Sequence, residues 1–236
     1  QVKRVEDLPV WEKGCDSSYT WAKKYKHLMG QETPEVLANK IVDILKTDSN
    51  PEGKFLHPMS KQRQHLCFTG GEPLMVTGQA ASVGIYNELL KQGNLPESMT
   101  FETNGTQKLK QEFKDWATGI DQEVFFSCSP KLFTVSGEQS KKAIIPEVIG
   151  EYRQVSKAGQ LKFVVGSEQR QWDEMDSVIE KFRAEGVDWP VWVMPVGARE
   201  EEQTATAGDV AKMAFQRGYN VAARVHVYLF GNAIGT

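Results

Sequence analysis

The residues best suited to chemistry in this chain form a short run of small, acidic and backbone-exposing residues. Residues 69–73 read Thr-Gly-Gly-Glu-Pro and follow residues 65–69, which predict a buried strand. Glycine lets another molecule approach the backbone closely, and proline fixes the direction in which the chain leaves. Bare carbonyls and a carboxylate accept hydrogen bonds from a cation such as an ammonium group. The run predicts a small-molecule site, although a tight strand-to-helix loop has the same composition.

A second group suited to chemistry is the thiol of Cys15. It lies in residues 14–21, Gly-Cys-Asp-Ser-Ser-Tyr-Thr-Trp, where small polar residues and an acid precede the aromatic residues. Such a setting favours an exposed thiolate that can bind metal, although a structural free cysteine is the alternative. The chain has 3 cysteines without paired spacing, which argues against a disulfide framework. We interpret the other two, Cys67 and Cys128, as core thiols because both lie in or beside predicted strands.

Composition and charge favour one domain that binds a small molecule. With 236 residues, 40% of them hydrophobic, the chain can bury a full core of α/β size. The net charge is -3 and like charges are not grouped in blocks, so the basic surface of a nucleic-acid binder is missing. No apolar run approaches the roughly 20 residues of a membrane helix, and residues 1–10 are too polar for a secretion signal. We therefore expect a cytoplasmic protein that binds neither nucleic acid nor membrane.

Segments typical of strands and of helices alternate along the chain. The predicted strands are residues 65–69, 99–102, 124–127, 161–165, 191–194 and 221–230. The predicted helices are residues 34–45, 80–90, 107–117, 169–185 and 209–216, with a further helix from about residue 146. This alternation predicts an α/β fold with a parallel sheet and right-handed crossovers.

Polar or glycine-rich residues cluster where the predicted strands end. The four clusters are residues 69–72, 102–105, 129–131 and 195–197. Because the carboxyl ends of parallel strands open on the same edge of a sheet, where α/β folds place their sites, the four loops should converge. The sequence therefore predicts one pocket at this edge.

Taken together, these residues resemble the radical S-adenosylmethionine (SAM) superfamily and, within it, the 7-carboxy-7-deazaguanine synthase family. The matching segments are residues 15–17, 19–21, 69–73, 102–106, 129–132, 161–165, 194–195 and 224–226. They occur in the family's order and cover residues 15–236. The resemblance implies a partial, open parallel β/α barrel of the radical SAM type.

The resemblance also implies the cofactors and the reaction. In the superfamily, three cysteine thiolates bind a [4Fe-4S] cluster, and the fourth iron binds the amino and carboxylate groups of SAM. Cleavage of SAM gives a radical that would remove a hydrogen from C6 of 6-carboxy-5,6,7,8-tetrahydropterin. The pterin ring then contracts, ammonia leaves and SAM is re-formed, which gives 7-carboxy-7-deazaguanine for queuosine and related modified guanines. The implied activity is that of a carbon-nitrogen lyase.

The cluster motif departs from the family pattern at Cys15. The family commonly has two residues between the second and third cysteines, but the position three before Cys15 is Glu12. We expect residues 1–236 to form a single radical SAM domain that lacks the first strand and the first two cluster cysteines, which would lie upstream of Gln1. A true loss of the cluster is the alternative.

The resemblance assigns roles to individual residues. The residues implied for SAM are Thr69, Gly70, Gly71, Glu72, Thr103, Asn104, Ser129, Lys131 and Pro195. In that assignment Glu72 and the bare backbone bind the methionine ammonium, Lys131 faces a carboxylate and Pro195 frames the adenine. Turn-forming or solvated roles are the alternative for the polar members, and Lys162 is a further residue that could contact the cofactor.

Four more residues are implied, for the cluster, for Mg2+ and for the substrate. Cys15 is the implied cluster ligand, and Ser17 aligns with a family threonine that binds Mg2+ beside the substrate carboxylate. His226 aligns with a histidine that contacts the pterin, and the chain end at Thr236 resembles a terminus that folds towards the substrate. A satisfied core histidine is the alternative for His226.

Three functions of different classes remain open. The first is the pterin-converting lyase, the second is a radical SAM activase that places a glycyl radical on a partner protein, and the third is a protein without a cluster that binds a pterin or nucleoside. The resemblance alone implies a homodimer and a flavodoxin-like electron donor. Turnover of the pterin separates the first from the second, and iron uptake separates both from the third.

Overall fold

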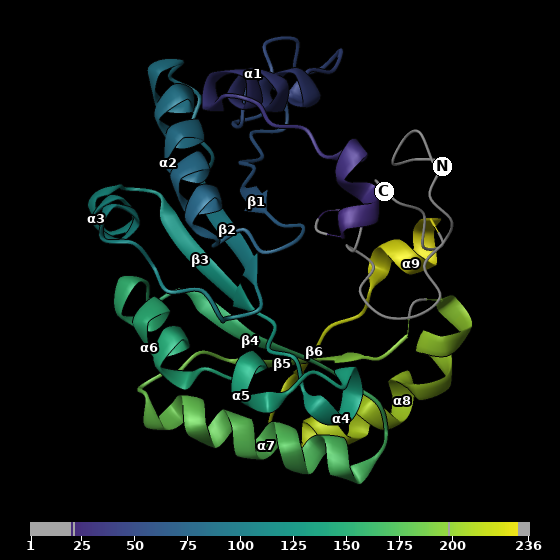
Figure 1. Ribbon diagram of the computed structural model, residues 1–236. Helices are drawn as coiled ribbons and strands as arrows, with labels where there is room; N and C mark the ends of the chain where they lie inside the picture. The colour runs from purple at the N-terminus through teal and green to yellow at the C-terminus, as the bar shows by residue number, and fades with distance from the viewer. Residues whose placement is uncertain (1–19, 21, 198, 231–236) are drawn as a thin grey trace.

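The protein is described by a computed structural model that covers residue 20, residues 22–197 and residues 199–230. Six parallel strands form one sheet in chain order (Figure 1). They are β1 (Leu66–Phe68), β2 (Ser98–Thr103), β3 (Glu123–Cys128), β4 (Gly159–Val165), β5 (Val191–Pro195) and β6 (Asn220–Val221). The predicted α/β class and parallel sheet are thereby confirmed. Within the described residues β1 and β6 are not paired, so hydrogen bonds do not close the sheet.

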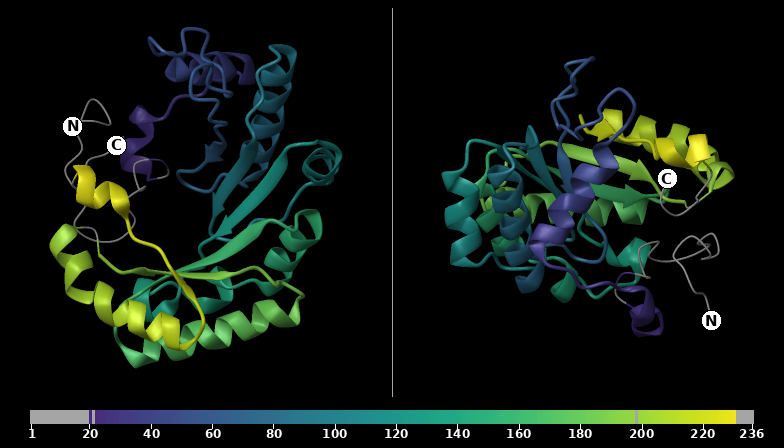
Figure 2. Two further views of the ribbon diagram at one scale, coloured as in Figure 1. Left: turned by 180° about the vertical axis from the view of Figure 1, so that it is seen from behind. Right: turned by 90° about the horizontal axis from the view of Figure 1, so that it is seen from above.

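Helices connect the strands and flank the sheet, which curves so that most of them lie on its outer side (Figures 1 and 2). The longer helices are α1 (Pro34–Leu45), α2 (Val76–Lys91), α3 (Gln111–Gly119), α6 (Pro146–Val155), α7 (Gln169–Ala184) and α8 (Glu200–Gln216). The short ones are η3 (Lys23–Leu28), α4 (Phe133–Ser136), α5 (Ser140–Ala143) and α9 (Val225–Phe230). The predicted start of α1 is confirmed, since the Thr33 hydroxyl accepts a hydrogen bond from the amide of Val36 at 3.4 Å and Pro34 is the first helical residue.

The two faces of the sheet differ in burial. Along β4, Leu161, Phe163 and Val165 are fully buried in the main hydrophobic core, whereas the alternate residues Gln160 and Lys162 are only half-buried. Successive side chains of a strand point to opposite faces, so one face packs on the core under the helices and the other is partly open. We call this second face the inner face. Parallel sheets are usually covered on both faces, which makes a half-open inner face with polar residues a candidate binding surface.

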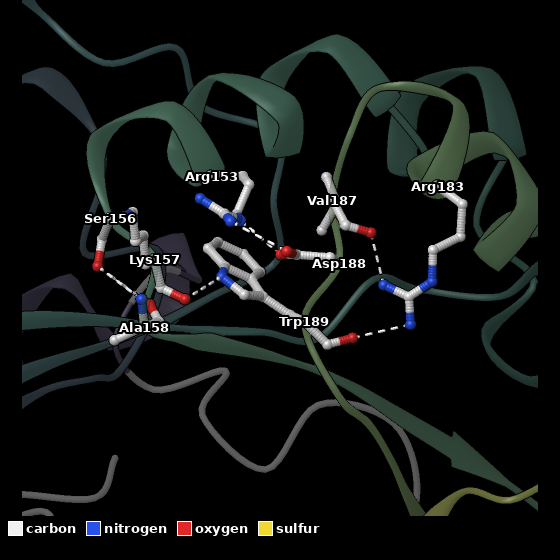
Figure 3. Close-up of polar contacts among 8 residues, drawn as sticks. All are labelled: Arg153, Ser156, Lys157, Ala158, Arg183, Val187, Asp188 and Trp189. Carbon is white, nitrogen blue, oxygen red and sulfur yellow. Dashed lines mark hydrogen bonds and ion pairs between the residues drawn. The ribbon is translucent and has the colours of Figure 1, made fainter.

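The amino edge of the sheet is fixed by a network around Trp189 (Figure 3). The Trp189 indole donates to the Lys157 carbonyl at 3.0 Å, and Arg183 donates to the carbonyls of Val187 and Trp189 at 2.5 and 2.8 Å. The indole lies against Gly159, where an added Cβ would stand 2.4 Å from Cε2 of Trp189. These contacts rigidify the starts of β4 and β5. The predicted site residues lie at the opposite edge, where the strands end.

The predicted strand over residues 221–230 is wrong. Only Asn220 and Val221 pair with β5, and residues 225–230 form helix α9, in which Val227 is buried. The β-branched and aromatic residues favour a strand, but β6 has a neighbour on one side only, and pairing ends after the amide of Ala222 donates to Val193. His226 therefore lies on a helix.

Helix α8 also begins earlier than predicted, at Glu200 instead of residue 209. Its first turn is fixed by a capping box, in which the Arg199 amide donates to the Glu202 carboxylate at 3.2 Å. The three acids at positions 200–202 suit the positive end of a helix dipole, a signal that the hydrophobic period alone does not carry. In the part of the chain that the structure describes, no helix is both long and apolar enough to cross a membrane.

Candidate functional site

The loop after β1 has the backbone geometry that its glycines predict. Gly70 and Gly71 have φ values of 78° and 48°, in the left-handed region that glycine adopts without strain. Thr20 packs on this loop: Cβ atoms built on Gly70 and Gly71 would lie 3.4 Å from its Cγ2 and 3.2 Å from its Oγ1. Thr20, which follows Cys15 by five residues in the sequence, is thus in contact with the glycine loop.

The carboxylate of Glu72 joins the loop after β1 to the loop after β2. Its Oε1 accepts hydrogen bonds from the Thr103 hydroxyl at 2.7 Å and the Leu74 amide at 3.1 Å. Its Oε2 accepts one from the Asn104 amide at 2.8 Å. Glu72 and Thr103 were both predicted as SAM-binding residues, and the structure brings them into direct contact with each other. Glu72 is half-buried and Thr103 is only 3% exposed.

The loop after β3 is tied to the same place. The amide of Ser129 donates to the Thr103 carbonyl at 2.7 Å. The Asn104 side-chain oxygen accepts from both the amide and the hydroxyl of Thr106, at 3.0 and 2.7 Å, which fixes the rotamer of Asn104. Lys131 is exposed two residues beyond Ser129. Six of the predicted SAM residues on the loops after β1 and β2, and Ser129 after β3, thus lie at one edge of the sheet, as predicted.

Helix α8 holds the loop after β5 through hydrogen bonds. Gln203, which is fully buried, donates to the carbonyls of Pro195 and Gly197 at 2.9 and 2.8 Å. Arg224 also donates to the Gly197 carbonyl, at 3.2 Å, so the residues that lead into α9 are linked to the same loop. His226 follows Arg224 by two residues, lies in α9 and is half-buried. Sequence reasoning missed Gln203, although a glutamine on the buried face of a helix is the signal for such a clamp.

A charged pair lies on the inner face below these loops. Lys162 Nζ lies 3.0 Å from Glu102 Oε1, and the Thr69 hydroxyl donates to Glu102 Oε2 at 3.1 Å. The Lys162 side chain is 18% exposed and that of Glu102 is 40% exposed, so the pair is partly desolvated but open to a ligand. Glu102 was matched only as part of a motif. Its place at an inner-face position of β2, one residue before the strand ends, is the signal that identifies it as a site residue.

The two described cysteines differ in solvent exposure. Cys128 is buried, as predicted, but Cys67 is exposed, so its interpretation as a core thiol is wrong. Cys67 pairs with Thr100 and Cys128 with Thr103, three residues along β2, which puts their side chains on opposite faces of the sheet. The strand alternation thus takes Cys67 to the inner face.

Both thiols are held in the protonated form. Desolvation and then the charge of Glu102 raise the pKa of Cys67, Lys162 lowers it, and the result is a pKa of about 11. Burial, followed by the charge of Glu72, raises the pKa of Cys128 well above its usual value. Because the two thiols lie on opposite faces of the sheet, Cys67 and Cys128 cannot ligate one cluster together. Among the described residues no group of three or more His, Cys, Asp or Glu side chains could hold a metal ion. Cys15, Ser17 and Thr236 lie outside the described residues.

Comparison with known proteins identifies one relative of known name. A 7-carboxy-7-deazaguanine synthase from Rhodopirellula baltica is 30% identical to this chain over 183 residues. The similar region is 73% of this chain and 64% of that protein, so the chain spans less than two thirds of the length of its relative. No family model and no solved structure matches the chain. The chain is thus similar to a protein of that name over about three quarters of its own length.

Proposed function

We propose that the protein is a radical SAM lyase that converts 6-carboxy-5,6,7,8-tetrahydropterin to 7-carboxy-7-deazaguanine with loss of ammonia, in the biosynthesis of 7-deazaguanines. The similarity to the Rhodopirellula baltica synthase supports this assignment. The open, curved parallel sheet is compatible with the partial β/α barrel of the radical SAM type. In such folds the site lies at the carboxyl ends of the strands.

The observation that carries the proposal is the junction of the first two loops through Glu72. Its hydrogen bonds to Thr103 and Asn104 join the glycine loop to the neighbouring loop above the charged pair of the inner face. The Thr69 hydroxyl, which begins the glycine loop, donates to Glu102, so this loop lies next to the Glu102–Lys162 pair. A tight connecting loop alone, the alternative for residues 69–73, would need no such junction with β2.

The residues at this edge fit the polar groups of SAM. Gly70 and Gly71 hold their backbone in a left-handed conformation and carry no Cβ, which allows another molecule to approach their carbonyl oxygens closely. Those oxygens suit an ammonium group. The Asn104 amide and the Ser129 hydroxyl suit ribose or carboxylate oxygens, and Lys131 suits a carboxylate charge. The clamped backbone at Pro195 would frame the adenine.

Iron and magnesium would be bound by the segment that precedes Thr20. Cys15 would supply a thiolate to a [4Fe-4S] cluster, and the Ser17 hydroxyl would supply a hard oxygen ligand to Mg2+. The contact of Thr20 with the glycine loop is the structural reason to place this segment next to the SAM residues. Bound at such a cluster, SAM supplies a radical that can remove a hydrogen atom from carbon.

The chain's own groups would bind and orient the pterin on the inner face. The Lys162 ammonium would attract the substrate carboxylate, and the Glu102 carboxylate would accept hydrogen bonds from ring or amino N–H groups. His226, on the helix linked to the β5 loop through Arg224, would contact the ring, and Thr236 is a further contact predicted from the sequence. Because Glu102 and Lys162 are held by strands of one sheet, they need little rearrangement when a polar substrate binds.

The test is anaerobic turnover by the full-length native protein after reconstitution with iron and sulfide. SAM, Mg2+, reductant and 6-carboxytetrahydropterin are supplied, and mass spectrometry looks for 7-carboxy-7-deazaguanine. Appearance of this product supports the lyase. Iron uptake without turnover of the pterin would favour a glycyl-radical activase, and pterin binding without iron uptake would favour a binding protein. The flavodoxin-like donor and the homodimer remain predictions, which exchange of the reductant and measurement of the mass in solution would check.

A further inference from the structure

We propose that Thr103 is a positioning residue that holds the Glu72 carboxylate in place. The hydrogen bonds of Glu72 to Thr103, Asn104 and Leu74 form a brace between the loops after β1 and β2. Glu72 then acts by fixing the glycine loop and Asn104 instead of serving as a ligand for the cofactor ammonium. The inference rests on the proposed function, because it concerns the SAM site of that function. It differs from the role expected for Glu72 from the sequence, in which the carboxylate binds the ammonium group directly.

The first support is that protein donors already occupy most of the acceptor positions of the Glu72 carboxylate. A carboxylate offers about four lone-pair positions, and Glu72 uses three of them for protein donors. The donors are the Thr103 hydroxyl at 2.7 Å, the Asn104 amide at 2.8 Å and the Leu74 amide at 3.1 Å. Hydrogen bonds to an ionised acceptor are stronger than neutral ones, so a ligand would have to compete with three of them.

The second support is the direction of the Thr103 hydroxyl. Its oxygen accepts a hydrogen bond from the Gly105 amide at 3.1 Å, and its hydrogen is therefore directed at Glu72. The Thr103 side chain is 3% exposed and cannot itself reach a ligand in the open part of the site. The turn at Gly105 requires glycine, because its φ is 78° and an added Cβ would stand 2.7 Å from Cδ1 of Ile149. Thr103 thus transmits the rigid turn at Gly105 to Glu72.

The third support is the surroundings of the brace. Tyr152 is fully buried and donates from its hydroxyl to the Gln107 carbonyl at 2.5 Å. Burial raises the pKa of Tyr152, the neighbouring Cys128 and Glu72 raise it further, and hydrogen bonding with Thr103 and the Gln107 backbone lowers it by less. Tyr152 and Cys128 therefore stay neutral and contribute no charge that would draw Glu72 away from Thr103. The brace lies at the boundary between this neutral core and the open edge of the sheet.

The test compares two substitutions at Thr103 with a control on the same strand. Thr103→Val keeps the shape but removes the hydroxyl, Thr103→Ser keeps the hydroxyl, and Thr100→Val removes a half-buried hydroxyl from the inner face of β2. The full-length, anaerobically reconstituted protein is used throughout. Hydrogen exchange of the Leu74 and Asn104 amides is measured without ligand, and the Kd of SAM is measured by equilibrium dialysis.

The brace predicts faster exchange at both amides in Thr103→Val and a rise in the Kd of SAM of about tenfold. Thr103→Ser should restore both quantities, and Thr100→Val should change neither. Unchanged exchange and unchanged Kd in Thr103→Val would overturn the brace. So would tight binding in Thr103→Val together with loss of binding in Glu72→Gln, since that pattern means a direct ionic contact from Glu72.

The two proposals fail in different ways. A wild-type protein that binds iron but not SAM contradicts the proposed function. Hydrogen exchange of the Leu74 and Asn104 amides is measured without ligand, so it still tests the brace in that case. If Thr103→Val does not fold, Glu72→Gln provides the second variant. A glutamine has an NH2 group in place of one carboxylate oxygen, so it loses the hydrogen bond from either the Asn104 amide or the Thr103 hydroxyl. Faster exchange at Asn104 in Glu72→Gln, with an unchanged melting temperature for the rest of the chain, supports the brace; unchanged exchange contradicts it.

Discussion

The Lys162 ammonium lies 3.0 Å from the Glu102 carboxylate, and this ion pair joins β4 to β2 across the intervening strand β3. Between them lies Ser127, which is opposite Glu102 and opposite Gln160 in the sheet register. The pair is on the face of the sheet that the outer helices do not cover. Ion pairs of this exposure contribute little to stability, about 0–1 kcal/mol, so its position on the inner face is better explained by function.

Lys162→Met should weaken pterin binding more than it weakens the fold. The lost ammonium removes the attraction for a substrate carboxylate, and KM for the pterin should rise at least about tenfold. The free energy of unfolding should fall by less than about 1 kcal/mol, because the pair is partly exposed. Steady-state kinetics and urea unfolding measure the two effects.

The matched control for Lys162 is Lys157→Met at the opposite edge of the sheet. The Lys157 side chain is exposed, and it is the carbonyl of this residue that accepts the Trp189 hydrogen bond. Lys157→Met should leave KM unchanged. An equal rise of KM in both variants would mean that net charge, and not the site, attracts the substrate.

Cys67 should be a slow nucleophile and should not bind the cluster. With a pKa of about 11, roughly one thiol in a thousand is ionised at pH 8. Its alkylation by iodoacetamide should therefore be slow at pH 8 and should accelerate until about pH 11. Cys67→Ser should keep the full iron content after reconstitution, whereas Cys15→Ala should lose it. Loss of iron in Cys67→Ser would reverse the assignment of the two cysteines.

Glu174 should stabilise the loop after β3 only while it is ionised. It accepts hydrogen bonds from the Thr134 hydroxyl at 2.6 Å and from the amides of Phe133 and Thr134, each at 2.9 Å. Burial raises its pKa, but the bonds from Thr134 and Phe133 outweigh burial and hold the pKa below its ordinary value. The stabilisation is thus complete above the unfolded pKa of about 4.3 and is lost as the pH falls through the lower, folded pKa.

Glu174→Gln should therefore lower the free energy of unfolding at pH 7 by roughly 1–2 kcal/mol. The difference from wild type should shrink as the pH falls below about 4. Urea unfolding at several pH values measures it, with Glu180→Gln at an exposed position of the same helix as the control. A difference that stays constant down to acid pH would show that the charge of Glu174 is not what fixes the loop.

Gly159→Ala should destabilise the amino edge of the sheet. The new Cβ would stand 2.4 Å from the fully buried Trp189 indole, which the Lys157 carbonyl holds in place (Figure 3). Overpacking of this kind costs about 1–3 kcal/mol. Gly208→Ala in helix α8, where nothing lies within 4 Å of the added carbon, should instead be neutral or stabilise by up to about 1 kcal/mol. Equal midpoints of urea unfolding for the two variants would contradict the predicted clash.

The sequence predicts the central strands because they are short runs of β-branched, aromatic and other apolar residues, which in β4 alternate with Gln160 and Lys162. It predicts the loops at the carboxyl edge because glycine, proline and polar residues end those strands. It does not predict the end of β6, since pairing with β5 stops after Val221 although β5 continues to Pro195, and β-branched residues such as Val225 and Val227 carry no information on that pairing. Helix α9 is the result of this tertiary effect.

Side-chain partners in the site are the part that sequence reasoning cannot supply. Glu72 and Thr103 are 31 residues apart, and only the parallel pairing of β1 with β2 brings them within 2.7 Å. The exposure of Cys67 depends in the same way on the inner face being left open by the helices. Residue type alone indicates that Glu72 is a good acceptor, but the fold decides which donors it meets.

The most direct measurement of the proposed function uses 6-carboxytetrahydropterin with deuterium at C6, supplied to the full-length, reconstituted protein with SAM, Mg2+ and reductant. Mass spectrometry follows the label. Removal of the C6 hydrogen by the SAM radical predicts deuterium in the recovered SAM pool together with 7-carboxy-7-deazaguanine, and predicts neither in Cys15→Ala. Full iron content and bound SAM, with no product and no deuterium outside the substrate, would contradict the proposed function.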